Sequence, residues 1–488
     1  SDTIALDTTT GNDIYVIEPG AQDDSGEIAV SLNGSTTTTI NFAGTEAITI
    51  SSLGLDPASG DGGIDALTFE GSGSDDAITI DNATADSGTT QVGSGPLVTY
   101  SSLGAGSTVT VNALGGTDSV SLTSTAADDT LGYTATGADS ASISLSTGGE
   151  IITFSLSGTE SVTVDAAGQA ASDTLNVTTL DASITSTGGG GGIVDPVDIA
   201  GNALLSLTYA GIETVAVTGT TGVVQGTSGN DTISLSSAGL VTVTDLFGNS
   251  SSTDVSVFSA LVINALGGSD SITITAPGVG SGMFTTGVTV LGGDADTGGD
   301  SVTLTGSAFN GDAISVDLDA NTVDGLLDDL GDVITLNSVE NLSIDALGDP
   351  LDTLSVTGTS GHDTLTFEAS SATDGSVTLA GGAMGVTYSN LSGTLTVDGG
   401  TAGVDVLVVQ GTEGVDTVTS VSTTAVNLTG TVTIGGDIDR LDIQTGGGND
   451  SITISHAISL AKVVDAGDGN DTINLAAAGT SDTTIIGG

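Results

Sequence analysis

The sequence predicts an all-β protein whose short strands wind into a repetitive β-solenoid, like a parallel β-helix. Three observations predict this fold: a block of about 50 residues recurs along the chain, apolar and polar residues alternate within each block, and Gly, Asn and Asp interrupt the alternation roughly every eight to twelve residues. A string of β-sandwich domains stays open as an alternative, because two blocks would supply the roughly 100 residues that one sandwich needs.

Each block has the same order of parts: an aromatic residue, a short turn, an alternating strand, a Gly turn, and an Asp that leads into a second strand. Its instances occupy residues 40–54, 98–116, 152–168, 207–219, 334–348 and 386–400. The last apolar residue of the block's first strand falls at Ile50, Val111, Val164, Val217, Ile263, Ile344, Val397 and Ile443. Residues 1–488 therefore read as one continuous repetitive region of about eight to nine units, with a Gly-rich loop insertion near residues 188–192.

The charge of the chain excludes several classes of binding partner. It has 61 Asp and Glu residues against 2 Lys and Arg residues, a formal net charge of -59, although 37% of the residues are hydrophobic. Arg440 and Lys462 cannot neutralise a nucleic-acid backbone or an anionic membrane surface. No apolar run approaches the roughly 18 residues of a membrane-spanning helix. We therefore expect no nucleic acid and no membrane insertion, and a cationic partner such as a divalent metal ion.

Asp residues mark the turns before many strands, each followed by a small residue and then an alternating apolar pair. Several come in pairs 11 residues apart, such as Asp65 with Asp76 and Asp352 with Asp363. Stacked coils would align such residues in rows, and rows of carboxylates repel each other unless a cation lies between them. Calcium accepts six to eight oxygens from carboxylates and backbone carbonyls, so it is the predicted ion. The candidate ligands are Asp65, Asp76, Asp118, Asp129, Asp231, Asp270, Asp300, Asp352, Asp363, Asp405, Asp416, Asp450, Asp468 and Asp471, and Asp173 carries the same pattern. The alternative is that each Asp only caps its own turn.

A family resemblance rests on the C-terminal turns. Residues 466–474, AGDGNDTIN, resemble the RTX nonapeptide Gly-Gly-x-Gly-x-Asp-x-apolar-x, which binds calcium in a parallel β-roll. Residues 226–234, 358–366 and 411–419 match it with Thr in place of the second Gly, and residues 446–454 are a shortened form. RTX motifs run in tandem, whereas other strands separate them here. The longer unit is similar to the strand repeats of giant bacterial surface proteins and adhesins, which implies secretion and a role at the cell surface or in a matrix.

A second repeated acid precedes the first strand of several blocks, at Glu46, Glu160, Glu213 and Glu340. Its constant position predicts a constant structural task. Either it holds a backbone amide of the turn or it completes the shell of a bound metal ion.

The aromatic residues recur at equivalent places of the block, at Phe42, Tyr100, Phe154, Tyr209, Phe258 and Tyr388. This regularity predicts a stack of rings in the core and not an exposed platform for sugars.

The sequence predicts no enzyme. A polysaccharide lyase on a β-helix would need a basic residue in its site, but Arg440 and Lys462 lie outside the repeated pattern. His456 is isolated, and His362 fills the variable position before Asp363. A β-helix enzyme acting on polysaccharides and an ice-binding protein with arrays of Thr are kept as alternatives.

The function that these observations predict is structural. We expect an extracellular protein of a bacterial surface layer, fibre or matrix, which associates with copies of itself and is stabilised by calcium at its Asp and Gly turns. The alternative is the stalk or ligand-binding region of a large calcium-dependent adhesin, with cell-surface glycans as partners. The start at Ser1 without Met suggests a mature or trimmed piece of a longer repetitive protein.

Overall fold

The computed structural model describes residues 2–7, 12–20, 22, 24–51, 65–166, 172–179, 181–188, 190–197, 202–218, 221–256, 258–276, 283–295, 299–306, 311–326, 333–382, 384–476 and 481–487. Within these residues all regular elements are β-strands, and 23 strands belong to each of two large sheets, A and B. The prediction of an all-β, repetitive solenoid is confirmed. In this described part, no helix is long and apolar enough to cross a membrane.

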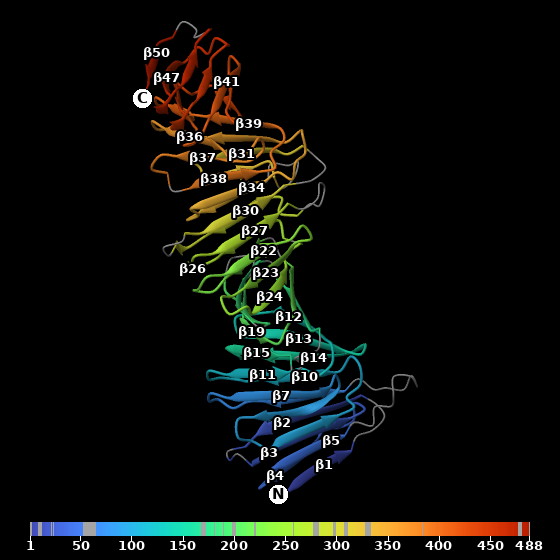
Figure 1. The fold of residues 1–488 in the computed structure, drawn as a ribbon. Coiled ribbons are helices and arrows are strands. Elements are labelled where there is room, and N and C mark those ends of the chain that lie inside the picture. Colours follow the sequence, from blue (N-terminus) through green and yellow to red (C-terminus); the bar gives the residue numbers. More distant parts are fainter. Residues whose placement is uncertain are drawn as a thin grey trace. The chain divides into compact units, whose positions relative to one another are not determined.

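The chain divides into two compact units, Ser1–Gln225 with Val241–Phe258, and Gly226–Leu240 with Ser259–Gly488. Figure 1 shows successive strands of each unit lying side by side. Each unit contains part of sheet A and part of sheet B.

In the first unit, hydrogen-bonded neighbours in sheet A follow the order β1 (Thr3–Asp7), β5 (Ala47–Ser51), β9 (Leu97–Ser101), β8 (Ser87–Val92), β7 (Ala77–Thr84), β11 (Ser119–Thr123), β15 (Ser161–Asp165), β19 (Leu207–Ala210), β18 (Gly191–Val197), β17 (Asp181–Gly188) and β21 (Thr221–Gln225). In sheet B they follow the order β4 (Thr38–Ala43), β3 (Ser25–Leu32), β2 (Asp13–Pro19), β6 (Ala66–Glu70), β10 (Thr108–Asn112), β14 (Glu150–Ser157), β13 (Ser140–Thr147), β12 (Asp129–Ala135), β16 (Thr174–Thr178), β20 (Thr214–Thr218) and β24 (Ser250–Asp254). The strand that precedes β24 in the chain is β23 (Leu240–Thr244).

In the second unit, the order in sheet A is β25 (Ala260–Asn264), β28 (Gly287–Leu291), β33 (Ile334–Asn337), β32 (Thr322–Asp324), β31 (Ala313–Asp317), β35 (Thr353–Thr357), β39 (Thr394–Asp398), β43 (Thr431–Ile434), β42 (Ala425–Asn427), β41 (Thr417–Ser422), β46 (Ser451–Thr453) and β49 (Thr472–Asn474). The order in sheet B is β22 (Thr232–Leu235), β27 (Ser271–Thr275), β30 (Ser301–Thr305), β34 (Asn341–Asp345), β38 (Gly385–Ser389), β37 (Gly375–Leu379), β36 (Thr364–Ala369), β40 (Val406–Gln410), β44 (Arg440–Gln444), β47 (Ala461–Asp465) and β50 (Thr483–Ile486). Two short pairs complete it: β26 (Gly267–Gly268) with β29 (Asp294–Ala295), and β45 (Gly447–Gly448) with β48 (Asp468–Gly469).

The chain alternates between the two sheets, and one passage through A and B is called a coil here. The strands have the expected period of two: β10 buries Val109 and Val111, whereas Thr108 and Thr110 point outward. The inner faces of A and B share one core, because Phe69 of β6 and Ile48 of β5 line the same small cavity. Alternation therefore decides which face of each strand is buried, and the outer faces carry mainly Thr and Ser.

Three-stranded antiparallel meanders interrupt the parallel stacking of coils. In sheet A of the first unit, β9 lies beside β5 and β7 lies beside β11, with β8 between them. The chain therefore enters the meander at β7, the strand farthest from β5, and leaves it at β9, which pairs with β5 of the preceding coil. Because the next coil then pairs with β7, each meander fastens neighbouring coils together.

The repeated aromatic side chains are buried, as predicted: Phe154 is 0% exposed and Tyr100 is 1% exposed. Four of them lie directly across a Gly on the neighbouring meander strand, in the pairs Gly26 with Phe42, Gly88 with Tyr100, Gly192 with Tyr209, and Gly375 with Tyr388. A Cβ atom at Gly375 would lie 2.5 Å from the Tyr388 hydroxyl, so the ring occupies the space that a side chain would need. Burial raises the pKa of Tyr209 and of Tyr388 to about 12.

Of the Gly-rich stretch at residues 188–192, Gly188 ends β17 and Gly191 begins β18. These two strands form an antiparallel hairpin with a register shift between Ser186 and Gly188. Gly190 has a φ of 77°, a left-handed conformation that Gly adopts without strain.

Candidate functional site

The Asp residues close their own turns in the motif Gly-Thr-x-Gly-x-Asp. In residues 358–363, the Thr359 N–H donates to Asp363 Oδ2 at 2.5 Å, and the Thr359 hydroxyl donates to Asp363 Oδ1 at 2.9 Å. The same hydroxyl accepts the Gly361 N–H at 3.0 Å. The first residue must be Gly, because a Cβ at Gly358 would lie 2.6 Å from Asp363 Oδ2 and from the Gly399 carbonyl oxygen. Both carboxylate oxygens are therefore bound inside the turn.

The same hydrogen bond closes three other turns in which Thr lies four residues before Asp. The pairs are Thr125 with Asp129, Thr227 with Asp231, and Thr412 with Asp416. At Asp76 the amide of Ser72 replaces that of Thr, at 2.6 Å. The Thr that departs from the RTX nonapeptide thus supplies donors to the carboxylate.

The Asp residues also link one coil to the next. The backbone N–H of Asp76 donates to Asp118 Oδ1 at 2.7 Å, and the N–H of Asp231 donates to Asp270 Oδ1, also at 2.7 Å. A set of acids joined in this way is called a row, and each acid is a rung. The rows are Asp2–Glu46; Asp13–Asp65; Asp76–Asp118–Glu160; Asp129–Asp173–Glu213; Asp231–Asp270–Asp300–Glu340; Asp312–Asp352; Asp363–Asp405–Asp439; and Asp416–Asp450–Asp471.

The pairs spaced by 11 residues do not share a row. Asp65 precedes β6 in sheet B, whereas Asp76 precedes β7 in sheet A. One strand separates the two residues, so they lie at opposite edges of the coil. The acids that meet are instead about one coil apart in the sequence, such as Asp76 and Asp118.

The repeated Glu residues end rows. Glu160 Oε2 accepts the Asp118 N–H at 2.6 Å, and Glu340 Oε2 accepts the Asp300 N–H at 2.6 Å. Glu213 does the same for Asp173 at 2.7 Å, and Glu46 does so for Asp2. Each of these Glu residues closes a three-residue turn between strands, whereas the turn before Asp118 has six residues. The prediction that these acids hold turn amides is confirmed.

A subset of rungs has one oxygen without a partner. Within the described residues, no hydrogen bond reaches the buried Oδ2 atoms of Asp118, Asp173, Asp270, Asp300, Asp352 and Asp450. These residues are at most 2% exposed, and none of them has a Thr four residues before it in the sequence, as Asp129, Asp231, Asp363 and Asp416 do. Burial raises the pKa of Asp270 to about 7 and raises the pKa of Asp173, Asp300 and Asp352. A proton or a bound cation would satisfy such an oxygen.

The candidate calcium ligands therefore share one setting, with one exception. Thirteen of the fourteen are rungs; Asp468 instead lies exposed in β48, where its N–H donates to the Gly446 carbonyl oxygen at 2.9 Å. In the part of the chain that the structure describes, no three acidic or His side chains gather closely enough to hold a metal ion. The rungs that were missed are Asp2, Asp13, Asp312 and Asp439. Asp13 and Asp312 follow the same pattern of a turn and then alternating apolar residues, which could have found them.

The side chain directly before several rungs forms a second link between coils. Asp75 Oδ1 accepts the Thr117 N–H at 2.8 Å, and Asn230 Oδ1 accepts the Ser269 N–H at 3.1 Å. His362 occupies the same position, where its Nδ1 accepts the Val404 N–H at 2.6 Å. This His is therefore part of the stacking of coils.

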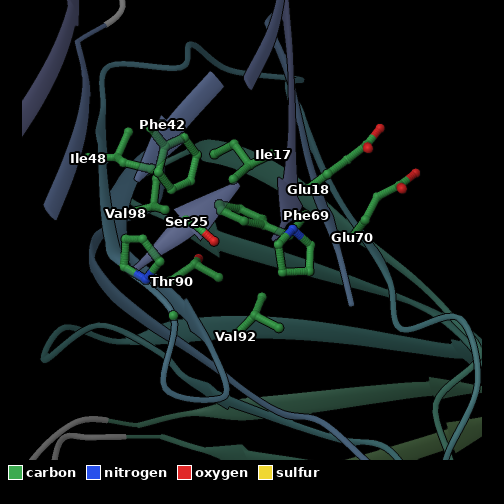
Figure 2. Close-up of a pocket in the computed structure, with 13 residues that line it drawn as sticks. Ile17, Glu18, Ser25, Phe42, Ile48, Phe69, Glu70, Thr90, Val92 and Val98 are labelled. Atoms are coloured by element: carbon green, nitrogen blue, oxygen red, sulfur yellow. The ribbon is translucent and has the colours of Figure 1, made fainter. Parts of the chain in front are cut away.

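The small cavity between the sheets is part of the core. It measures about 30 Å³ and is lined by Ile17, Phe42, Ile48 and Phe69 among others. Figure 2 shows Glu18 and Glu70 pointing away from these apolar side chains. A cavity of this volume holds about one water molecule, so it is too small for a sugar.

No family model matches this chain, and no curated protein matches it in sequence.

Proposed function

We propose that the protein is a structural module of an extracellular surface layer, fibre or matrix, of the kind that bacteria secrete, and that it is not an enzyme. The rows carry this proposal. Acids are by far the most abundant charged groups of the chain, 61 against 2 Lys and Arg, and many of those at turns accept backbone amides of a neighbouring coil. Their repetition along the described residues strengthens the stack of coils.

We propose further that calcium stabilises the rungs whose Oδ2 atom lacks a partner. A buried carboxylate oxygen without a donor favours a cation, and backbone carbonyls and water would have to complete the shell. Calcium would also screen the net charge of -59, which otherwise opposes association between copies.

Thermal unfolding followed by circular dichroism, with light scattering, tests this proposal. The protein is compared in millimolar calcium, in equal magnesium and in excess chelator. We expect a higher melting temperature and larger particles in calcium than in magnesium. An equal melting temperature in all three solutions would remove calcium from the proposal, and a monomer in all three would remove self-association.

The stalk or ligand-binding region of an adhesin is the second candidate. One observation favours it: the tip between β23 and β24 exposes Leu246 and Phe247, which are 68% and 86% exposed. Exposed aromatic side chains are typical contact residues for glycans and proteins. Saturable binding to cells or glycans that is lost in Phe247→Ser would support this candidate, and binding unchanged by that substitution would oppose it.

A further inference from the structure

The turns before the rungs are of two kinds, which differ in the use of one backbone amide a few residues before Asp. In a closed turn, that amide belongs to Thr and donates to the carboxylate, as the Thr227 N–H does to Asp231 Oδ2 at 2.5 Å. In the turn before Asp270, the amide belongs to Leu266 and donates to Asn264 Oδ1 instead, at 3.3 Å. No hydrogen bond from the described residues then reaches Asp270 Oδ2. Such a turn is called open here.

A second open turn precedes Asp352. The Leu347 N–H donates to Asp345 Oδ1 at 3.0 Å, and the buried Asp352 Oδ2 again has no partner among the described residues. Both open turns begin with Asn or Asp followed by Ala-Leu-Gly, at residues 264–267 and 345–348. The closed turns have no Asn or Asp two residues before their Thr, where the chain carries Thr123, Gln225, Thr357 and Gln410.

The backbone of the open turns is held in a strained conformation. Leu266 has a φ of 74° and Leu347 a φ of 55°, in the left-handed region where a side chain other than that of Gly crowds the backbone. Leu114, in the same sequence before Asp118, has a φ of 70° and is 53% exposed, so burial does not explain the strain. Among the described residues, no Thr of a closed turn has a positive φ. The next coil fixes Leu266, because a Cβ at Gly293 would overlap its carbonyl oxygen.

We propose, resting on the calcium proposal above, that the Asn or Asp side chain of an open turn is a positioning residue, which holds the amide of Leu away so that the rung keeps one carboxylate oxygen for a cation. Asn264 has this role for Asp270, and Asp345 has it for Asp352. The amide and the cation compete for the same oxygen, so a turn that closes as the one before Asp231 does takes no ion at that atom. The ion therefore binds a subset of the rungs, which is marked by the Asn or Asp and by the left-handed residue two places later.

Converting one open turn into a closed one tests this inference. Ala265→Gly with Leu266→Thr gives residues 265–270 the sequence Gly-Thr-Gly-Gly-Ser-Asp, which matches the closed motif Gly-Thr-x-Gly-x-Asp. The readout is hydrogen exchange at the Asp231 N–H, which donates to Asp270 Oδ1 at 2.7 Å. In chelator, exchange should be at least about threefold slower in this double variant than in the wild type, because the new donors bind Asp270 Oδ2. In millimolar calcium, exchange should slow at least about tenfold in the wild type and less than about twofold in the double variant.

Two substitutions at one position test the positioning residue itself. Asn264→Ala removes the acceptor of the Leu266 N–H, whereas the control Asn264→Asp keeps an Oδ1 atom there, as Asp345 does in the second open turn. Asn264 is half-buried at the end of β25, so neither substitution should unfold the chain. We expect Asn264→Ala to reduce the calcium effect on exchange at Asp231 to below about threefold, and Asn264→Asp to keep it within about twofold of the wild type.

The outcomes separate this inference from the calcium proposal. If calcium slows exchange equally in the wild type, the double variant and Asn264→Ala, the Asn side chain does not control the site and only this inference fails. If calcium changes neither the melting temperature nor the exchange rate of the wild type, the calcium proposal fails. The comparison in chelator then decides this inference: equal or faster exchange in the double variant overturns it, whereas slower exchange upholds the division into open and closed turns.

Discussion

Two neighbouring rungs of one row should respond in opposite ways to the same substitution. Asp231 receives the Thr227 N–H on Oδ2 at 2.5 Å and the Thr227 hydroxyl on Oδ1 at 3.0 Å. Asp270 receives the Asp231 N–H on Oδ1 at 2.7 Å, but no described residue donates to its Oδ2. Both side chains are buried, at 3% and 2% exposure. The pair therefore compares a satisfied carboxylate with a half-satisfied one in the same setting.

Asp231→Asn should destabilise the protein. In Asn, an NH₂ group replaces one carboxylate oxygen and would face either the Thr227 N–H or the Thr227 hydroxyl, both of which are donors. Hydrogen bonds to a charged group contribute about 1.5–3 kcal/mol each. Allowing for partial rearrangement of the Thr227 hydroxyl, we expect a loss of about 2–4 kcal/mol.

Asp270→Asn should be neutral or stabilising at pH 8 without calcium. Its amide oxygen can still accept the Asp231 N–H. Burial raises the Asp270 pKa from its usual value near 4 to about 7, so ionising it at pH 8 costs up to about 4 kcal/mol at about 1.4 kcal/mol per pKa unit. The hydrogen bond from the Asp231 N–H is weaker to a neutral amide than to a carboxylate, and this offsets about half of that cost, which leaves a gain of up to about 2 kcal/mol.

Urea unfolding in chelator measures both effects, with hydrogen exchange at the row amides to detect segmental unfolding of a repeat protein. Equal losses in the two variants, or a larger loss in Asp270→Asn, would refute the division of rungs into satisfied and half-satisfied ones. In calcium, Asp270→Asn should also show a smaller rise in stability than the wild type if the cation binds Oδ2.

Three further predictions concern the buried carboxylates with raised pKa values, the Thr359 hydroxyl and the His362 side chain. In chelator, the melting temperature should fall as the pH rises from about 5 to 8. The pKa values of Asp173, Asp270, Asp300 and Asp352 are raised, so the folded state binds more protons than the unfolded state, and this stabilisation is lost as the pH passes the folded pKa, about 7 for Asp270. A melting temperature that rises over that interval would contradict the prediction. Thr359→Val should cost about 1.5–3 kcal/mol in urea unfolding by removing the hydroxyl donor to Asp363, whereas Thr359→Ser should cost under about 1 kcal/mol, and equal losses would show that the hydroxyl is unimportant. His362→Asn should preserve stability, because Asn230 already occupies the equivalent position, whereas His362→Ala should lose about 1 kcal/mol; similar values for both would remove His362 from the stacking of coils.

Much of the fold could be read from the sequence because its signals are local. Alternation marks Val109 and Val111 as core residues of one strand, and the regular spacing of aromatic residues marks Tyr100 and Phe154 as buried. The Asp before each strand marked thirteen rungs for the same reason, since the turn that it closes lies within a few residues of it.

The meanders and the rows were decided only by the tertiary structure. Strands β8 and β10 have the same period of two, although β8 is the middle strand of an antiparallel meander and β10 is a parallel strand of the next coil. Alternation therefore cannot distinguish the two kinds of strand. The spacing of 11 between Asp65 and Asp76 is enough for one strand and one turn, but the spacing alone could not show that this strand places the two residues at opposite edges of the coil. The partner of an Asp carboxylate is an amide about 40 residues away, and only the folded chain determines which amide that is. The sequence thus determined which residues are buried and which turn, and the packing of coils determined which of them meet.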